Sequence, residues 1–527
     1  MANNPLKQLA GETAVYGLST ILARIINFLF VPFYTRLLTT ANYGVVTEFM
    51  AYIAVLQVVL TMGLETGCFR FANKEGAQPN RVYSSALAMV SGVSLGFFAL
   101  MVVFAEPLAH LLGYDGYGSC MAYMGGILAL DSITAILFAK LRQEHRAVKF
   151  AVFKTLKILV ETGANILLFF PFVSLCSRRA AALGVDVSAL TPSDVWLLHF
   201  VSPTPDFSYV IFAILLSCIV CALLFIPDLV RLNFEFDGKL LRRMLVYSLP
   251  LMVAALPGIV NDFLDRILFR FLDTNAEQWQ SSLGIFQAAV KLAVIMNLFI
   301  QMFRFAAEPF FFQRAKDKGS KELYARVMEL FTAFCAIVFL GVIFYIDIIS
   351  LLLGRDFRSG VGVVPIMLFS YMVLGMLFNV SMWYKLSGKT NMAIWITSAG
   401  LFVTLVVNLV FMPKYSYWAA AFGHLASYVV MFILSAVLGQ KYWPVPYRWG
   451  RILGTLALMF LFYGLASLAD THLFHFAGWD TDRHLLWWKL GVHTVLLLGY
   501  LLSAWALLRK GIAPGAGDGS DVGAVRQ

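Results

Sequence analysis

Long apolar stretches follow one another along nearly the whole chain, separated by short polar breaks. Each stretch reaches the roughly 20 residues that a transmembrane helix needs. The pattern therefore predicts about 14 membrane-spanning helices, at residues 14–38, 43–65, 83–105, 119–141, 148–172, 208–230, 243–271, 281–303, 324–353, 361–384, 392–412, 416–440, 450–469 and 486–508. The first stretch is too long for a signal-peptide core and no small-residue cleavage site follows it, so we expect it to remain as a helix.

The composition agrees with a chain whose main solvent is lipid. Hydrophobic residues make up 60% of the chain and charged residues 13%, a balance that excludes an ordinary water-soluble globule. The formal charge of +10 is scattered through the breaks rather than gathered in one domain, so we expect no nucleic-acid partner. The six cysteines form no CxxC pair and no cluster with histidine, so we expect no disulfide framework, no metal site and no cofactor.

The distribution of lysine and arginine predicts how the chain is oriented. Most of the 40 basic residues lie in alternate breaks, on the same side as both termini. The breaks of the other side hold only nine, namely Arg36, Arg178, Arg179, Arg270, Arg355, Arg358, Lys414, Arg483 and Lys489. The positive-inside rule then places both termini in the cytoplasm, which requires an even number of helices. The largest outer connection, residues 173–208, is too short for a typical catalytic domain.

An internal repeat divides the predicted helices. The segment Arg36–Thr40 (RLLTT) resembles Arg270–Thr274 (RFLDT), and Phe69–Ala72 (FRFA) is identical to Phe303–Ala306, both at a separation of 234 residues. Six helices separate the copies, and an even number preserves orientation. The repeat therefore predicts an all-α membrane protein with two parallel, pseudo-symmetric six-helix lobes around a central cavity, plus two C-terminal helices. We expect the lobes at 1–235 and 236–445, the last helices at 446–510 and a disordered tail at 511–527.

Charged residues inside the predicted spans are the main functional signal. The basic ones are Arg24, Lys154, Lys157, Arg266 and Lys291, and the acidic ones are Glu48, Glu65, Asp131, Glu161, Asp262 and Asp265. A charge at the bilayer centre costs about 2.5–3.5 kcal/mol on insertion scales, so each should face a cavity or a partner.

Two of these cations have no acidic neighbour on their own helix. Arg24 has no acid within one turn, and Gln287 and Ile295 occupy the i±4 positions of Lys291. We interpret both as cavity cations that hold an anionic group such as phosphate, for which a guanidinium offers bidentate donors. The structural alternative for Arg24 is a pair with Asp131 or Glu65 from another helix.

The other charges allow both functional and structural interpretations. Lys157 and Glu161 can pair at i, i+4, or Lys157 can face the cavity, while Lys154 can extend to the cytoplasmic interface. The helix at 243–271 carries Arg266 with several acids and contains two prolines that should kink it. The acids Asp131, Glu161, Asp262 and Asp265 are coupling or structural residues, and a second-lobe cation site would include Asn408 and His424.

Several segments resemble one known family. The resemblance rests on Val31–Leu38 (VPFYTRLL), Tyr43-Gly44, Met62–Leu64, Phe69-Arg70, Ser248–Pro250, Asp265-Arg266, Leu283–Phe286, Lys291-Leu292 and the turn at Lys385–Thr390. In these segments the chain resembles the polysaccharide-exporter branch, the Wzx-like oligosaccharide flippases, of the multidrug/oligosaccharidyl-lipid/polysaccharide (MOP) superfamily. One departure is Phe286-Gln287, where that family often has Tyr-Ser.

The resemblance implies a flippase that moves undecaprenyl-diphosphate-linked oligosaccharide across the bacterial inner membrane. It would act as a monomer by alternating access, with a cationic cavity for the diphosphate, and whether H⁺ or Na⁺ drives transport stays open. The alternatives are a cation-coupled drug or metabolite antiporter of the same superfamily, a flippase for a lipid-linked peptidoglycan precursor, and a membrane polysaccharide polymerase or ligase. We find no nucleophile–base pair in the sequence, so we expect a transporter and no catalytic residues.

Overall fold

The computed structural model describes residues 17, 21–73, 78–275, 277–314, 319–474 and 483–509, and this part of the chain is built from helices. It contains 13 helices that are long and apolar enough to cross a membrane. The first predicted span, 14–38, lies partly outside the described residues, which show helix at 21–29 and in α2 (Val31–Leu37). The predicted all-α, multi-pass architecture is confirmed. The predicted tail at 511–527 lies outside the described residues.

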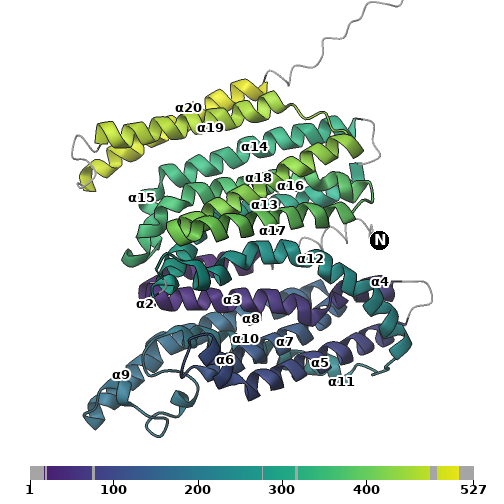
Figure 1. Ribbon diagram of the computed structural model, residues 1–527, viewed down its shortest axis with the longest axis vertical. Coiled ribbons are helices and arrows are strands. Elements are labelled where there is room, and N and C mark those ends of the chain that lie inside the picture. Colours follow the sequence, from purple (N-terminus) through teal and green to yellow (C-terminus); the bar gives the residue numbers. More distant parts are fainter. Residues whose placement is uncertain are drawn as a thin grey trace, which may run out of the picture.

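The N-terminal helices gather in one half of the molecule, drawn in purple to blue in Figure 1. We call this group the N-lobe. Its long helices are α3 (Thr40–Thr61), α5 (Pro79–Val103), α7 (Gly118–Gln143), α8 (Ala147–Leu167) and α10 (Phe207–Leu224), with the shorter α4 (Leu64–Ala72), α6 (Ala105–Leu111) and α11 (Ile226–Val230).

Two features of the N-lobe differ from the simple pattern of one apolar run per helix. The predicted helix at 43–65 ends early, because Met62 and Gly63 take left-handed backbone angles, with φ of 50° and 65°, and α4 begins at Leu64. The predicted helix at 148–172 instead runs on through a π-helical turn, Leu168–Phe172, into α9 (Val173–Leu183). The predicted outer connection therefore begins with a helix, α9, and continues from Gly184 as loops with two short 3₁₀ segments.

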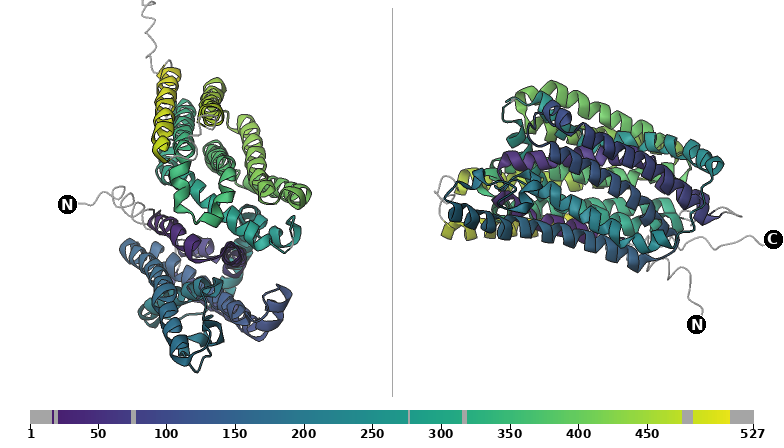
Figure 2. Two further views of the ribbon diagram at one scale, coloured as in Figure 1. Left: turned by 90° about the vertical axis from the view of Figure 1, so that its left-hand side faces the viewer. Right: turned by 90° about the horizontal axis from the view of Figure 1, so that it is seen from below.

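The remaining helices form the second half. The C-lobe comprises α12 (Gly238–Leu272), α13 (Trp279–Arg314), α14 (Ser320–Phe344), α16 (Val364–Leu386), α17 (Asn391–Tyr415) and α18 (Tyr417–Tyr442), with the 3₁₀ segment η5 (Arg355–Val363) before α16. Outside it lie α19 (Trp449–Leu468) and α20 (Arg483–Arg509), which pack on α14 at the edge of the molecule, as Figures 1 and 2 show. The residues at which the lobes were predicted to divide stay a prediction.

The two lobes meet through α3, α12 and α13. Helix α13 packs along α3, and α12 contacts both α4 of the N-lobe and α17 of the C-lobe. Helix α12 continues unbroken through Pro250 and Pro257. Side chains on the facing sides of these three helices therefore line the interface between the lobes.

Candidate functional site at the lobe interface

The N-lobe pairs two of the predicted candidate residues with each other. Lys157 of α8 donates from Nζ to Asp131 Oδ1 of α7 at 2.5 Å, and Cys218 of α10 lies 3.4 Å from the same oxygen. Both charged side chains are about a fifth exposed, at 18% and 26%. The close ion pair of Lys157 is therefore formed with another helix, and Glu161, its predicted partner on α8, interacts with it electrostatically. Lys157 is held inside the lobe by its partner and is not a free cavity cation.

The other N-lobe charges also find neighbours. Lys154 lies over the ring of Phe138, with its Nζ 4.3 Å from the ring centre, rather than extending to the interface. Glu65 is paired with Arg142, 3.3 Å away. Glu65 and Asp131 thus form ion pairs with Arg142 and Lys157, and neither is paired with Arg24 as the sequence had suggested. Glu161 interacts electrostatically with Lys157 and with Tyr34 of α2.

The C-lobe contains a buried polar cluster between α12, α17 and α18. The Oδ1 atom of Asn261 accepts hydrogen bonds from Thr404 at 2.6 Å and from Ser427 at 3.0 Å. Asp262 accepts a hydrogen bond from the hydroxyl of Tyr428 at 3.0 Å. Asp262 lies four residues before Arg266 on the same helix and interacts with it electrostatically. Its hydrogen bond from Tyr428 also joins α12 to α18.

The same cluster includes both residues of the predicted second-lobe cation site. His424 Nε2 lies 3.4 Å from Asp265 Oδ2, and Gln287 of α13 donates to the same oxygen at 3.5 Å. Asn408 donates to the carbonyl of Thr404. In the described part of the chain Asp265 Oδ1, His424 Nδ1 and Asn408 Oδ1 are buried without a hydrogen-bond partner. Each of these atoms can therefore accept a proton or coordinate a small cation.

An ion pair that the sequence did not predict joins the lobes. The guanidinium of Arg270, at the end of α12, donates from Nε and Nη2 to the two carboxylate oxygens of Glu48 on α3, both at 2.8 Å. The Glu48 side chain is fully buried and Arg270 is 13% exposed. A bidentate arginine–carboxylate pair fixes both distance and orientation. This pair lies at the end of the molecule that is expected to face outward.

Aromatic residues surround this pair. Tyr52 and Tyr114 donate their hydroxyls to Glu48, and Arg270 lies over the rings of Tyr114 and Trp279, 4.9 and 4.5 Å from their centres. Burial, and then the neighbouring carboxylate, raise the pKa of Tyr114, so its hydroxyl stays protonated and continues to donate. Arg270 also donates to the carbonyl of Leu112. The hydrogen bonds of the carboxylate and the guanidinium offset the cost of removing both charges from water.

The lobes are also in backbone contact near this pair. A Cβ atom added to Gly44 of α3 would lie 1.9 Å from the carbonyl oxygen of Gln280, and one added to Gly284 of α13 would lie 1.9 Å from that of Thr40. The hydroxyls of Thr40 and Ser281 are hydrogen-bonded at 3.1 Å. The crossing of α3 and α13 is therefore reciprocal, and it requires glycine on both helices.

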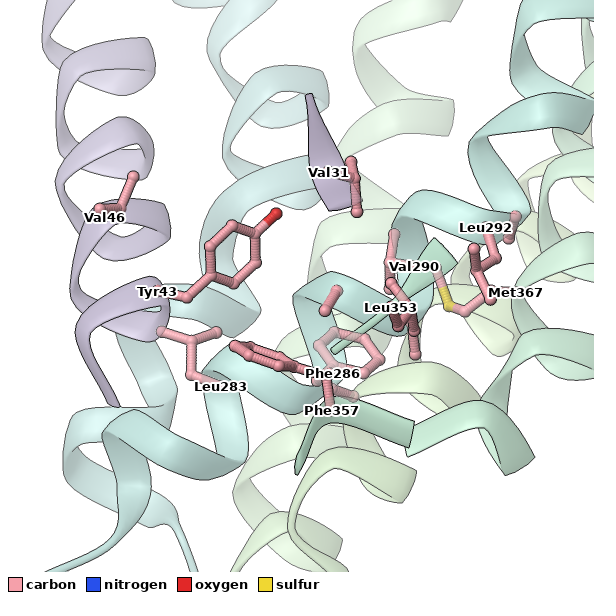
Figure 3. Close-up of a cluster of buried hydrophobic side chains, with 14 of the residues drawn as sticks. Val31, Tyr43, Val46, Leu283, Phe286, Val290, Leu292, Leu353, Phe357 and Met367 are labelled. Atoms are coloured by element: carbon pink, nitrogen blue, oxygen red, sulfur yellow. The ribbon is translucent and has the colours of Figure 1, made fainter. Parts of the chain in front are cut away.

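Apolar side chains fill the rest of this end of the interface. Figure 3 shows Val31 of α2 and Tyr43 and Val46 of α3 gathered with Phe286, Phe357 and other side chains of the C-lobe. The rings of Tyr43 and Phe357 meet edge to face, with 5.6 Å between their centres. The expected outer end of the lobe interface is thus closed by backbone contact, by an ion pair and by packed apolar side chains.

Deeper along the same helices the interface becomes cationic. Lys291 lies seven residues beyond Gly284, and so on the face of α13 that meets α3. Arg266 lies four residues before Arg270, on the face of α12 that carries the ion pair. The two cations interact electrostatically with each other. The structure gives Lys291 no ion pair or hydrogen bond among the described residues, and Arg266 Nε is buried without a hydrogen-bond partner there.

A second pair of cations lies on the first helix and α13. Arg24 is exposed and interacts electrostatically with Arg304, which the sequence placed in a cytoplasmic loop and the structure places within α13. The first helix lies beside this part of α13, because a Cβ at Gly17 would lie 3.4 Å from the Phe305 ring. Arg24 has no acidic partner among the described residues. Glu308, four residues after Arg304 on α13, is paired with Lys385, and a bound anion would offset the repulsion between Arg24 and Arg304.

Three comparisons relate the chain to known proteins. Residues 9–193 match the family model described as polysaccharide biosynthesis protein. The probable low-salt glycan biosynthesis flippase Agl15 of Haloferax volcanii is 18% identical over 472 residues, which cover 88% of this chain and 91% of that protein. The predicted resemblance to the MOP superfamily is thereby confirmed.

Solved structures share the fold. The lipid II flippase MurJ in an inward closed conformation superimposes with a TM-score of 0.66 at 14% identity, covering 94% of this chain and 99% of that one. The MATE multidrug transporter DinF-BH gives a TM-score of 0.52 at 15% identity, covering 83% of this chain and 96% of that one. At these identities the likeness concerns the fold alone, and it confirms the predicted fold class.

Proposed function

We propose, from the premise that the chain is a flippase of the MOP superfamily, that it moves a lipid-linked oligosaccharide from the cytoplasmic to the outer leaflet of the bacterial inner membrane. The carrier is an undecaprenyl diphosphate, and the protein acts as a monomer by alternating access. Both termini face the cytoplasm, as the distribution of basic residues suggests. The glycan flippase that aligns over most of the chain supports a glycan cargo.

One observation carries this proposal. Lys291 lies on the face of α13 that meets α3, and Arg24 lies on the first helix beside α13. The charged neighbours of both are arginines among the described residues, whereas Lys157 is paired within its lobe. An uncompensated cation within a membrane-spanning helix is expensive. A lipid diphosphate would supply the missing negative charge, and the planar guanidinium of Arg24 suits its oxygens. Arg266 and Arg304 add to the same positive field.

The closed outer end suggests the stage of the transport cycle. With Glu48 and Arg270 paired and α3 in contact with α13, the cationic region has no exit toward the expected outer side. We propose that this is the state in which substrate enters from the cytoplasmic leaflet. Release then requires the ion pair and the backbone contact to separate.

The C-lobe cluster supports coupling to a cation. Asp265, His424 and Asn408 each hold one buried atom without a partner in the described structure. A proton or Na⁺ bound there would change the charge of α12, the helix that contacts both lobes. The same feature would suit a cation-coupled antiporter of drugs or metabolites, which is the second candidate. Such a transporter has no evident use for the unpaired cations at the lobe interface.

A translocation assay tests the proposal. The protein is reconstituted into liposomes with a fluorescent polyprenyl-diphosphate-linked oligosaccharide, and flipping is followed by loss of fluorescence to an impermeant quencher. We expect Arg24→Ala and Lys291→Ala each to slow flipping at least tenfold. Arg178→Ala, which removes an exposed cation from the outer extension α9, should stay within twofold of wild type.

Two results would contradict the proposal. Unchanged flipping in both interface variants would reject the cationic site. Flipping of a lipid-linked peptidoglycan precursor but of no oligosaccharide would reject the proposed cargo while leaving the site intact.

A further inference from the structure

A cluster of three arginines lies far from the lobe interface, where α14 meets α19. Arg326 of α14 approaches Glu329 Oε2 at 3.0 Å, and Arg451 of α19 approaches the same oxygen at 3.5 Å. Arg448, which precedes α19, lies 3.7 Å from Glu329 Oε1. One carboxylate thus serves three guanidinium groups that come from two helices and the connection before α19.

The charges of this cluster do not balance. The Glu329 side chain is fully buried, while Arg448 is 49% exposed and Arg326 and Arg451 are about a quarter exposed. At neutral pH the four side chains carry a net charge of about +2, because arginine does not deprotonate in proteins. Fastening α19 to α14 needs only one of the three ion pairs. Each guanidinium has five N–H donors, and the hydrogen bonds of Arg326 and Arg451 to Glu329 each use one nitrogen.

The local backbone adds to the positive potential. Arg448 occupies the N-cap position of α19, and the first turn of this helix contains no acidic residue. The exposed N–H groups at a helix start carry a partial positive charge that favours anions. This contribution only reinforces the arginines, which are the basis of the inference.

Aromatic residues of the kind that collect at the level of lipid headgroups lie beside the cluster. Tyr447 and Trp449 flank Arg448 and pack against each other, with 5.4 Å between their ring centres. Trp443 lies nearby in the same connection, and Lys321 at the start of α14 lies over its ring. Tryptophan and tyrosine collect at membrane interfaces, where one end of the ring is apolar and the other is hydrated. Lys321 and all three arginines lie on the side expected to be cytoplasmic.

We propose that Arg326, Arg448 and Arg451 form a binding site for the phosphate group of a lipid in the cytoplasmic leaflet. Glu329 holds the three side chains together, and their remaining donors bind the phosphate oxygens, for which the planar guanidinium is well matched. The phosphate belongs either to an anionic phospholipid or to a polyprenyl diphosphate. The site is separate from the cations at the lobe interface, and its existence does not depend on what the protein transports.

Binding of defined lipids to the purified full-length protein tests this site. Native mass spectrometry measures the affinity for phosphatidylglycerol, for polyprenyl diphosphate and for phosphatidylcholine as the zwitterionic reference. The main variant is Arg448→Gln, because Arg448 is the most exposed of the three and leaves Arg326 and Arg451 on Glu329. The matched control is Arg242→Gln, which removes an exposed arginine from the same expected face of the membrane.

We expect Arg448→Gln to weaken binding of at least one anionic lipid about fivefold, and Arg242→Gln to change it by less than twofold. Arg448→Lys, which keeps the charge but loses the planar donors, should fall between wild type and Arg448→Gln. Weaker binding of phosphatidylglycerol alone identifies a phospholipid site, and weaker binding of polyprenyl diphosphate alone identifies a carrier site. Loss of both supports a shared phosphate site.

Two outcomes would overturn the inference. Equal losses in Arg448→Gln and Arg242→Gln would mean that lipids respond only to the general positive charge of this face. Unchanged binding in Arg448→Gln and in the double variant Arg448→Gln/Arg451→Gln would mean that the arginines serve only to fasten α19 to α14.

Discussion

At the scale of single residues, an intramembrane charge is informative only once its partner is known. The sequence showed that Lys157, Lys291 and Arg24 lie in predicted spans, but spacing along the chain identifies contacts only within one helix and cannot decide between partners on other helices. The structure separates them, because Lys157 reaches Asp131 on another helix whereas Lys291 and Arg24 find no acid among the described residues. The Glu48–Arg270 pair escaped prediction for the same reason, since its members are 222 residues apart in the sequence.

The assignment of Lys157 as structural leads to a stability prediction. Lys157→Met should leave the Asp131 carboxylate partly buried and unpaired, and we expect it to lower the free energy of unfolding by about 3 kcal/mol. In the double variant Lys157→Met/Asp131→Asn the unpaired carboxylate is also removed, so most of the lost free energy of unfolding should be regained. Thermal unfolding of the purified variants measures both effects. Arg81→Met, which breaks an ion pair with Glu235 that is about half exposed on both sides, serves as the control and should change little.

A different result would reassign the residue. If Lys157→Met is as stable as wild type and yet fails to transport, then Lys157 acts on substrate and the pair with Asp131 is incidental.

At the scale of helices, the length of the apolar runs predicted where helices form, but it did not predict where helices contact one another. The 13 long apolar helices of the described residues follow from runs of about 20 apolar residues, which can be recognised without knowing the contacts between helices. The break at Met62-Gly63 and the extension from α8 into α9 depend on packing, so the hydropathy pattern placed those boundaries wrongly. The motif residues Gly44 and Gly284 stood out in the sequence as part of a resemblance, and only the structure shows that α3 and α13 cross at them.

The crossing yields a prediction about one methyl group. In Gly284→Ala the added carbon would meet the Thr40 carbonyl oxygen, so α3 and α13 must separate and the apolar cluster beside them should loosen. We expect an impermeant thiol reagent added from the outer side to label Val46→Cys several-fold faster in the Gly284→Ala background. Gly92→Ala, on the lipid-exposed part of α5 with open space around it, is the matched control. Equal labelling in both backgrounds would show that the crossing does not close this end.

At the scale of the whole molecule, the charges at the lobe interface differ between its two parts. An ion pair closes one end, and cations without an ion pair among the described residues lie deeper. The end of the interface that is expected to face outward carries the Glu48–Arg270 pair and the glycine crossing, and the region deeper along α12 and α13 carries Arg266 and Lys291. The repeat in the sequence predicted two lobes, and hydropathy predicted the two added helices. Neither could show which end of the interface is closed, because closure depends on contacts between residues from opposite lobes.

The central claim is that cargo crosses the membrane only when this closed end opens. Thr40 and Ser281 bring their hydroxyls within 3.1 Å across the crossing, so Thr40→Cys/Ser281→Cys should form a disulfide that holds α3 against α13. The six native cysteines are buried, which limits competing crosslinks. Each single-cysteine variant provides a control that cannot form the bridge.

The most direct measurement is translocation of labelled lipid-linked oligosaccharide by the double-cysteine variant in liposomes, first oxidised and then treated with reductant. We predict that oxidation stops flipping and that reduction restores it to the level of the single-cysteine variants. Undiminished flipping with the disulfide fully formed would contradict the account, because cargo would then cross the membrane while the outer end stays closed.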